Sequence, residues 1–287
     1  MLPVTRVLAP NPGVYTLEGT NTWVVGSEPS IVIDPGPDLP EHLADVARTA
    51  GRVGAVLITH DHPDHAPGAV PFATLVGAPL YAYRLAGAEE LRAGQRVRAG
   101  TLDLTAIHTP GHTSDHISFF EPGSGALFTG DAVVGRGTSF IDPPDGDLVQ
   151  YLRSLTRMRD LDPRTIYPGH GPLVLRARET ILEYLAHREA REAQVLAALD
   201  DGPRTITEMV EVIYADHPKE VHPLAARSLL ANLLKLADEG RAERSGKADN
   251  GPWTASTPRT CQRCGRRVKG KARYCSSCSL AMLQAEG

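Results

Sequence analysis

The chain has 287 residues, of which 41% are apolar and 22% charged, and its formal net charge is −4. This is the composition of an ordinary folded protein, long enough for one large domain or about two to three smaller ones. No apolar run approaches about 18 residues and no basic start precedes an apolar segment, so we expect no membrane span and no secretory signal, and a cytoplasmic protein.

Charge and cysteine are both unevenly distributed. Residues 251–287 hold seven basic residues and one acid, a net charge of +6, so residues 1–250 carry −10. All four cysteines lie between positions 261 and 278, which excludes a disulfide framework in the larger part of the chain. The acidic part argues against a broad nucleic-acid surface, although a local groove stays open.

The first predicted elements are three short strands, at 14–17, 22–25 and 31–33, separated by glycine and proline. A helix is predicted over 41–50. The apolar, β-branched run at 53–58 then predicts a buried strand.

A dense group of potential metal ligands begins where this strand ends. His60, His62, Asp64 and His65 fall within six positions. His60 and His62 can share one metal ion, while Asp64 and His65, on the following turn, can face a second. Imidazole and carboxylate suit zinc, although manganese or iron accepts similar donors. The alternative is a solvated polar loop.

Further along the chain, three short apolar segments lead into Gly-His, Gly-Asp and Gly-His pairs that contain His112, Asp131 and His170. Strands and helices alternate here without a regular βαβ rhythm, which favours two mixed sheets packed face to face with helices outside. The predicted strands are 79–82, 102–107, 116–120, 126–128 and 165–167, and the predicted helices are 66–76 and 148–158.

HxHxDH followed in order by these three pairs resembles the metallo-β-lactamase superfamily. The resemblance implies an α/β (α+β) fold, a four-layer αββα sandwich with the metal ions at one edge of the sheets. It implies two ligand sets joined by a bridging Asp131, namely His60, His62 and His112 for one metal and Asp64, His65 and His170 for the other. Asp131 is typical of the glyoxalase II, lactonase, ribonuclease and thioesterase branches, so an antibiotic-destroying role is not expected.

The same resemblance bears on two neighbouring residues. Asp34 either supports the ligands from behind or simply forms a turn. His116 is expected to be a supporting or strand-end histidine, because the seven ligand positions are already filled.

The chain beyond the metal motifs predicts a small second domain. A long helix at 176–199 ends at an Asp-Asp-Gly-Pro break, and helices at 206–214 and 225–237 are followed by a glycine-turned hairpin that reaches Trp253. This is a winged-helix pattern. Together with Gly19–Trp23 and Ala186–Arg188, it resembles the lactamase-like protein 2 branch. The domain either caps the active-site cleft, which we favour, or binds nucleic acid.

Two CxxC pairs separated by ten residues complete the chain: Cys261, Cys264, Cys275 and Cys278. This spacing predicts a structural zinc ribbon, because four thiolates can surround one tetrahedral ion. The ribbon's basic loop suits RNA, an acidic partner or the chain's own acidic part. The predicted division is a catalytic domain at 1–200, a winged helix at 201–256 and the ribbon at 257–287.

We therefore expect a dinuclear zinc hydrolase in which Asp64 holds the attacking water and takes up its proton. The favoured substrate is a small acyl thioester or related ester, as for glyoxalase II or thioesterase members. The alternatives are a metal-dependent endoribonuclease, with RNA as partner, and a binding module with an inactive metal site.

Overall fold

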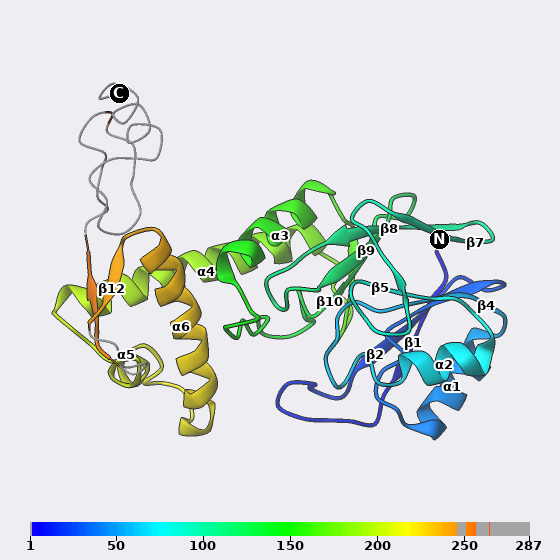
Figure 1. Cartoon of the computed structure of the whole chain (residues 1–287), viewed down its shortest axis with the longest axis horizontal. Coiled ribbons are helices and arrows are strands. Elements are labelled where there is room, and N and C mark those ends of the chain that lie inside the picture. The colour runs from blue at the N-terminus through cyan, green and yellow to red at the C-terminus, as the bar shows by residue number, and fades with distance from the viewer. Residues whose placement is uncertain (1, 246–250, 257–263, 265–287) are drawn as a thin grey trace, which may run out of the picture. The chain divides into compact units, whose positions relative to one another are not determined.

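The computed structural model describes residues 2–245, 251–256 and Cys264. The chain divides into two compact units, Met1–Leu185 and Ala186–Gly287 (Figure 1). The predicted domain boundaries at 200 and 256 stay predictions. Cys261, Cys275 and Cys278 lie outside the described residues, so the zinc ribbon also stays a prediction.

The first unit contains a six-stranded sheet in the order β1-β2-β3-β4-β5-β6. The first three strands are antiparallel, and the pairs from β3 to β6 are parallel. The strands are β1 Val4–Leu8, β2 Asn21–Val25, β3 Ser30–Ile33, β4 Val53–Leu57, β5 Leu80–Ala82 and β6 Glu89–Glu90.

A second sheet has five strands in the order β11-β10-β9-β8-β7, antiparallel except for the parallel pair β10–β11. The strands are β7 Arg96–Ala99, β8 Leu102–His108, β9 Ile117–Glu121, β10 Ala126–Gly130 and β11 Thr165–Pro168.

Alternating side chains place the first sheet between two apolar layers. Trp23 and Val25 on β2 pack in the core shared with the second sheet, whereas Val24 faces α1 (Pro40–Ala50) and α2 (Ala69–Val76). Helix α3 (Leu148–Asp160) lies against the second sheet, where Met158 contacts Ser118. The predicted αββα sandwich is confirmed (Figure 1).

The prediction of a first strand at 14–17 is wrong. This segment is a loop, in which Leu17 has φ +55°, a left-handed value that a strand cannot accommodate. The first strand is β1 instead, and the short strands β6 and β7 were also missed. The two residues of β6 are both exposed and too few to show a period, and β7 alternates between exposed and buried positions over only four residues.

The second unit is a helical domain with a small hairpin. The helix α4 (Ala177–Asp200) begins in the first unit and ends in the second. A core around Val195, Leu229 and Trp253 joins α4, α6 and the hairpin. The other elements are α5 Ile206–Ile213, a 3-10 turn Lys219–Val221, α6 His222–Asp238, β12 Ala242–Arg244 and β13 Trp253–Ala255.

Two local features set the helix boundaries in this unit. Thr205 and Glu208 form a reciprocal capping box that starts α5. Helix α6 begins three residues earlier than predicted, because proline at the first turn of a helix is favourable rather than disruptive. None of the described helices is both long and apolar enough to cross a membrane.

Candidate metal centre

The seven predicted metal-binding side chains meet at one edge of the sandwich. His60, His62, Asp64 and His65 lie on the loop that follows β4, and the other three follow β8, β10 and β11. His112 comes after β8, Asp131 after β10 and His170 after β11. The structure therefore brings the seven together in space, in two groups of donor atoms.

The first group contains His60, His62, His112 and Asp131. His62 Nδ1 lies 2.9 Å from His60 Nε2 and 3.2 Å from His112 Nε2. Asp131 Oδ2 lies 3.6 Å from His112 Nε2 and 4.0 Å from His60 Nε2. A tetrahedral zinc site with bonds of about 2.0–2.1 Å has ligand atoms about 3.3 Å apart. The four atoms are spaced as ligands of one ion.

The second group contains Asp64, His65 and His170. His65 Nε2 lies 3.3 Å from His170 Nε2 and 3.3 Å from Asp64 Oδ2, which is 3.1 Å from His170 Nε2. Asp131 reaches this group as well, because its Oδ1 lies 3.4 Å from His65 Nε2 and its Oδ2 lies 3.3 Å from His170 Nε2. One carboxylate thus faces both groups.

Each imidazole that presents Nε2 to the centre has a partner for its other nitrogen. The Nδ1 atom of His65 is 2.8 Å from Asp34 Oδ2, and the Nδ1 atom of His112 is 2.7 Å from the carbonyl oxygen of Phe140. The Nδ1 atoms of His60 and His170 lie near Thr59 Oγ1 and the Gly19 carbonyl oxygen, at 3.0 and 3.2 Å. Such contacts fix the tautomer and orientation of metal-binding histidines.

Asp34 and His116 both lie behind the centre. Besides contacting His65, Asp34 accepts hydrogen bonds from the backbone N–H and the hydroxyl of Thr59, at 2.8 and 2.7 Å. His116 is fully buried, and its Nε2 accepts a hydrogen bond from the Asp131 backbone N–H at 3.2 Å. Asp34 has the supporting position rather than only a turn-forming one, and His116 lies outside both groups of donor atoms.

Glycine precedes three of these side chains because no larger residue fits. A Cβ added at Gly169 would lie 2.5 Å from Asp131 Oδ1 and 2.7 Å from His65 Cε1. One at Gly111, which has φ +132°, would lie 2.3 Å from the backbone of Tyr151. The Gly-His and Gly-Asp pairs in the sequence thus reflect close packing around the centre.

A support that sequence reasoning missed comes from the loop before β2. Thr20 Oγ1 donates to Asp64 Oδ2 at 3.0 Å. The same oxygen accepts from Asn11 Nδ2 at 3.0 Å, and Asn11 Oδ1 accepts from the Thr20 N–H at 2.9 Å. This reciprocal pair leaves the Thr20 hydroxyl proton for Asp64. The sequence pattern Gly19–Trp23 contains Thr20, but nothing in that pattern predicts its hydrogen bond to Asp64.

Electrostatics separate the two groups in the metal-free chain. Burial opposes protonation of His65 and His170, but Asp131 and the neighbouring carboxylates prevail, raising the pKa of His65 well above its usual value and that of His170 to about 9. Burial lowers the pKa of His60 well below its usual value. Burial alone would raise the pKa of Asp131, yet His170 and His65 hold it well below its usual range. Metal uptake at the second group must therefore displace protons.

The residues present fit metal ions. Asp131 Oδ1 is buried and makes no hydrogen bond within the described part of the chain, so its full satisfaction requires another partner. Five imidazoles and two carboxylates are a donor set suited to zinc, manganese or iron. The centre is thus able to bind metal, and the donor set alone does not select the element.

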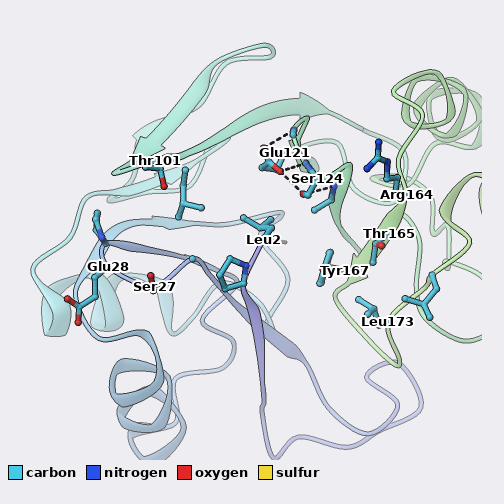
Figure 2. A pocket seen from close by; sticks show the side chains of 17 residues that line it. Leu2, Ser27, Glu28, Thr101, Glu121, Ser124, Arg164, Thr165, Tyr167 and Leu173 are labelled. Carbon is cyan, nitrogen blue, oxygen red and sulfur yellow. Dashed lines mark hydrogen bonds between the residues drawn. The ribbon is translucent and has the colours of Figure 1, made fainter.

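A cavity of about 940 Å³ lies at the opposite ends of the strands (Figure 2). It is lined by the β2–β3 and β9–β10 turns and by residues at the start of β8 and β11, including Glu28, Glu121 and Arg164. Glu121 accepts hydrogen bonds from the backbone N–H and the hydroxyl of Ser124, as Figure 2 shows. None of the seven predicted ligands lines this cavity, so it is separate from the metal centre.

Comparison with known proteins agrees with this fold and centre. The sequence matches the metallo-beta-lactamase superfamily over residues 15–170 and the beta-lactamase associated winged helix domain over residues 205–253. The chain therefore belongs to the metallo-beta-lactamase superfamily and is a metal-dependent hydrolase with an associated winged helix.

Individual relatives cover most of the chain. It is 34% identical to the Beta-lactamase-like protein 2 homolog of Caenorhabditis elegans over 257 residues, which span 84% of this chain and 86% of the relative. It is 36% identical to the Atrochrysone carboxyl ACP thioesterase of Aspergillus chevalieri over 254 residues, 82% and 81% of the two chains. The crystal structure of a metallo-beta-lactamase family protein from Thermus thermophilus superimposes with a TM-score of 0.75 at 22% identity, covering 88% and 98%.

Proposed function

We propose that the chain is a dinuclear zinc hydrolase that cleaves acyl thioesters. One zinc ion is held by His60, His62 and His112, and Asp131 is shared with the second. The second ion is held by Asp64, His65 and His170. The observation that carries this proposal is the position of Asp131, whose two oxygens lie within 4.0 Å of donor atoms in both groups.

The reaction requires attack of a water oxygen on the thioester carbonyl carbon, with loss of the thiolate. Metal ions held by these residues would polarise the carbonyl and lower the pKa of bound water toward neutral pH. Asp64 takes the proton of the attacking water and passes it to the departing sulfur. The Thr20 hydroxyl holds the Asp64 carboxylate in place, and the C–S bond breaks as the carboxylic acid forms.

Two observations support a thioester over RNA. The thioesterase relative aligns over most of both chains. In the second unit, two cations suited to nucleic acid are already paired: Lys235 and Arg241 both contact Glu192 and Glu239. Lysine and arginine side chains whose charge is balanced by neighbouring carboxylates contribute little to binding a polyanion. This pairing argues against a nucleic-acid role for the winged helix.

The test is a set of parallel assays of zinc-loaded protein on an acyl thioester, a lactone and single-stranded RNA. We expect thioester turnover that disappears in Asp64→Asn and Asp131→Ala. RNA cleavage through the same residues, with no turnover of thioester or lactone, would refute the thioesterase assignment while keeping the metal centre.

We also propose the three-part division at residues 200 and 256 and a third, structural zinc ion held by Cys261, Cys264, Cys275 and Cys278. The Asp-Asp-Gly-Pro break at 200–203 supports the first boundary, and the spacing of the two CxxC pairs and the charge reversal after residue 250 support the second boundary and the third ion.

A further inference from the structure

A group of cationic and aromatic side chains lies beside the metal centre but shares no residue with it. It consists of Tyr83 and Arg84 after β5, His108 at the end of β8, and Arg157 on α3. The Tyr83 and His108 ring centroids are 4.8 Å apart, and the Arg84 guanidinium carbon lies 4.8 Å from the Tyr83 centroid. Arg157 Nη1 donates to the His108 carbonyl oxygen. One guanidinium group therefore lies over the Tyr83 ring of this tilted pair, and the other contacts the backbone of His108.

Strand pairing places this group at the edge that carries the metal centre. Strands β4 and β5 run parallel, so His60 and Arg84 follow strand ends on the same side of the sheet. In the other sheet, His108 pairs with Ile117, whose N–H donates to the Thr59 carbonyl oxygen at 2.7 Å. With strands about 4.8 Å apart, His108 lies on the order of 10 Å from the chain at Thr59.

Both guanidinium groups are exposed and lack an acidic partner. Arg84 contacts a ring and Arg157 a backbone carbonyl, and within the described chain neither forms an ion pair with a carboxylate. The carboxylate close enough to His108 to interact with it electrostatically is that of Asp115. Its Oδ2 accepts a hydrogen bond from the Asp61 N–H at 2.9 Å. Arg84 and Arg157 thus place two positive charges around Tyr83 and His108 in a part of the chain whose net charge is −10, an arrangement suited to an anionic ligand.

The backbone at Arg84 gives an independent indication. Its φ is +62°, in the left-handed region that non-glycine residues rarely occupy. Such a conformation costs on the order of 1 kcal/mol and is concentrated at functional sites. A glycine would adopt this φ at no steric cost, and the chain carries an arginine here instead.

We propose that Arg84 and Arg157 form a subsite for the phosphate of a phosphopantetheine thioester, an inference that rests on the proposed thioesterase function. Guanidinium groups match phosphate through paired charge-assisted hydrogen bonds. About a dozen bonds of roughly 1.3–1.5 Å separate sulfur from phosphorus in such a substrate, a reach on the order of 15 Å. This reach exceeds the length of about 10 Å between His108, which both arginine side chains adjoin, and the chain at Thr59.

The experiment compares two thioesters that carry the same acyl group, one on phosphopantetheine and one on pantetheine without the phosphate. In the zinc-loaded full chain, the double substitution Arg84→Gln and Arg157→Gln should raise KM for the phosphorylated substrate by about tenfold or more, which corresponds to about 1.4 kcal/mol. Turnover of the pantetheine thioester should stay within about twofold of wild type. Arg153→Gln, an exposed arginine one helical turn before Arg157, is the matched control.

Binding of free phosphopantetheine and free pantetheine, measured by calorimetry, separates this inference from the proposed function. If the chain prefers free phosphopantetheine, loses this preference in the double variant and turns over no thioester, the phosphate subsite is supported and the thioesterase function is refuted. Equal effects of the double substitution on both ligands, or a preference that follows only a carboxylate on the acyl group, would overturn the phosphate subsite.

Discussion

Replacing Thr20 with valine tests whether the loop before β2 sets the second metal position. The substitution keeps the size and β-branching of the side chain but removes the hydroxyl that donates to Asp64 Oδ2. A hydrogen bond to a charged group is worth about 1.5–3 kcal/mol. The Asp64 side chain is 23% exposed, so water compensates in part and the lower end of the range applies. About 1.4 kcal/mol corresponds to a tenfold change in affinity.

We therefore expect Thr20→Val to weaken zinc binding at the group of Asp64, His65 and His170 by about tenfold, within the range of about 10–100-fold found for residues behind metal ligands. The affinity of the other group should change little. Titration against a chromophoric zinc chelator measures both constants. Thr20→Ser keeps the donor and should restore the weaker constant.

The matched control is Thr16→Val. The Thr16 hydroxyl donates to the Asn11 carbonyl oxygen in the same loop, at 2.6 Å, and does not contact Asp64. If Thr20→Val and Thr16→Val weaken zinc binding equally, or if Thr20→Ser fails to restore it, the hydroxyl does not position Asp64. A change confined to the thermal midpoint would indicate a structural role alone.

Four further outcomes are expected. Asp131→Ala should lower zinc content at both positions, whereas His116→Asn should lower stability more than zinc content, as measured by metal analysis and thermal unfolding. Gly169→Ala should abolish two-metal binding, because its Cβ would lie 2.5 Å from an Asp131 oxygen. Glu239→Gln should cost about 1 kcal/mol of unfolding free energy. Burial alone would raise the pKa of Glu239, but Lys235 and Arg241 hold it below its usual value. The loss of stability should therefore have its full size above pH 4.5 and become smaller as the pH falls below that value. Denaturant unfolding at several pH values measures it. A chain truncated after Thr257 should lose one zinc ion of three by elemental analysis, and loss of none would remove the ribbon.

The sequence was a good guide to the side chains at the centre and a poor guide to their support. His60 to His65 are contiguous, and His112, Asp131 and His170 each follow a glycine at a strand end, so both signals are local. The hydrogen bond between Thr20 and Asp64 joins residues 44 positions apart, and no residue type or spacing reports such a contact. The prediction of a strand at 14–17 failed for a related reason, since apolar residues in a loop over a site resemble a strand when read alone.

The metal centre can form only when the two sheets have packed together. The two groups of donor atoms combine one loop after β4 with the ends of β8, β10 and β11, which belong to the other sheet. Until the sheets pack, only His60 to His65 are near one another, so the unfolded chain binds metal weakly. Ions that prefer the folded chain stabilise it by mass action. Removal of metal should therefore loosen the contact between the sheets at this edge, while the cavity at the opposite strand ends, which contains none of these residues, should be unaffected.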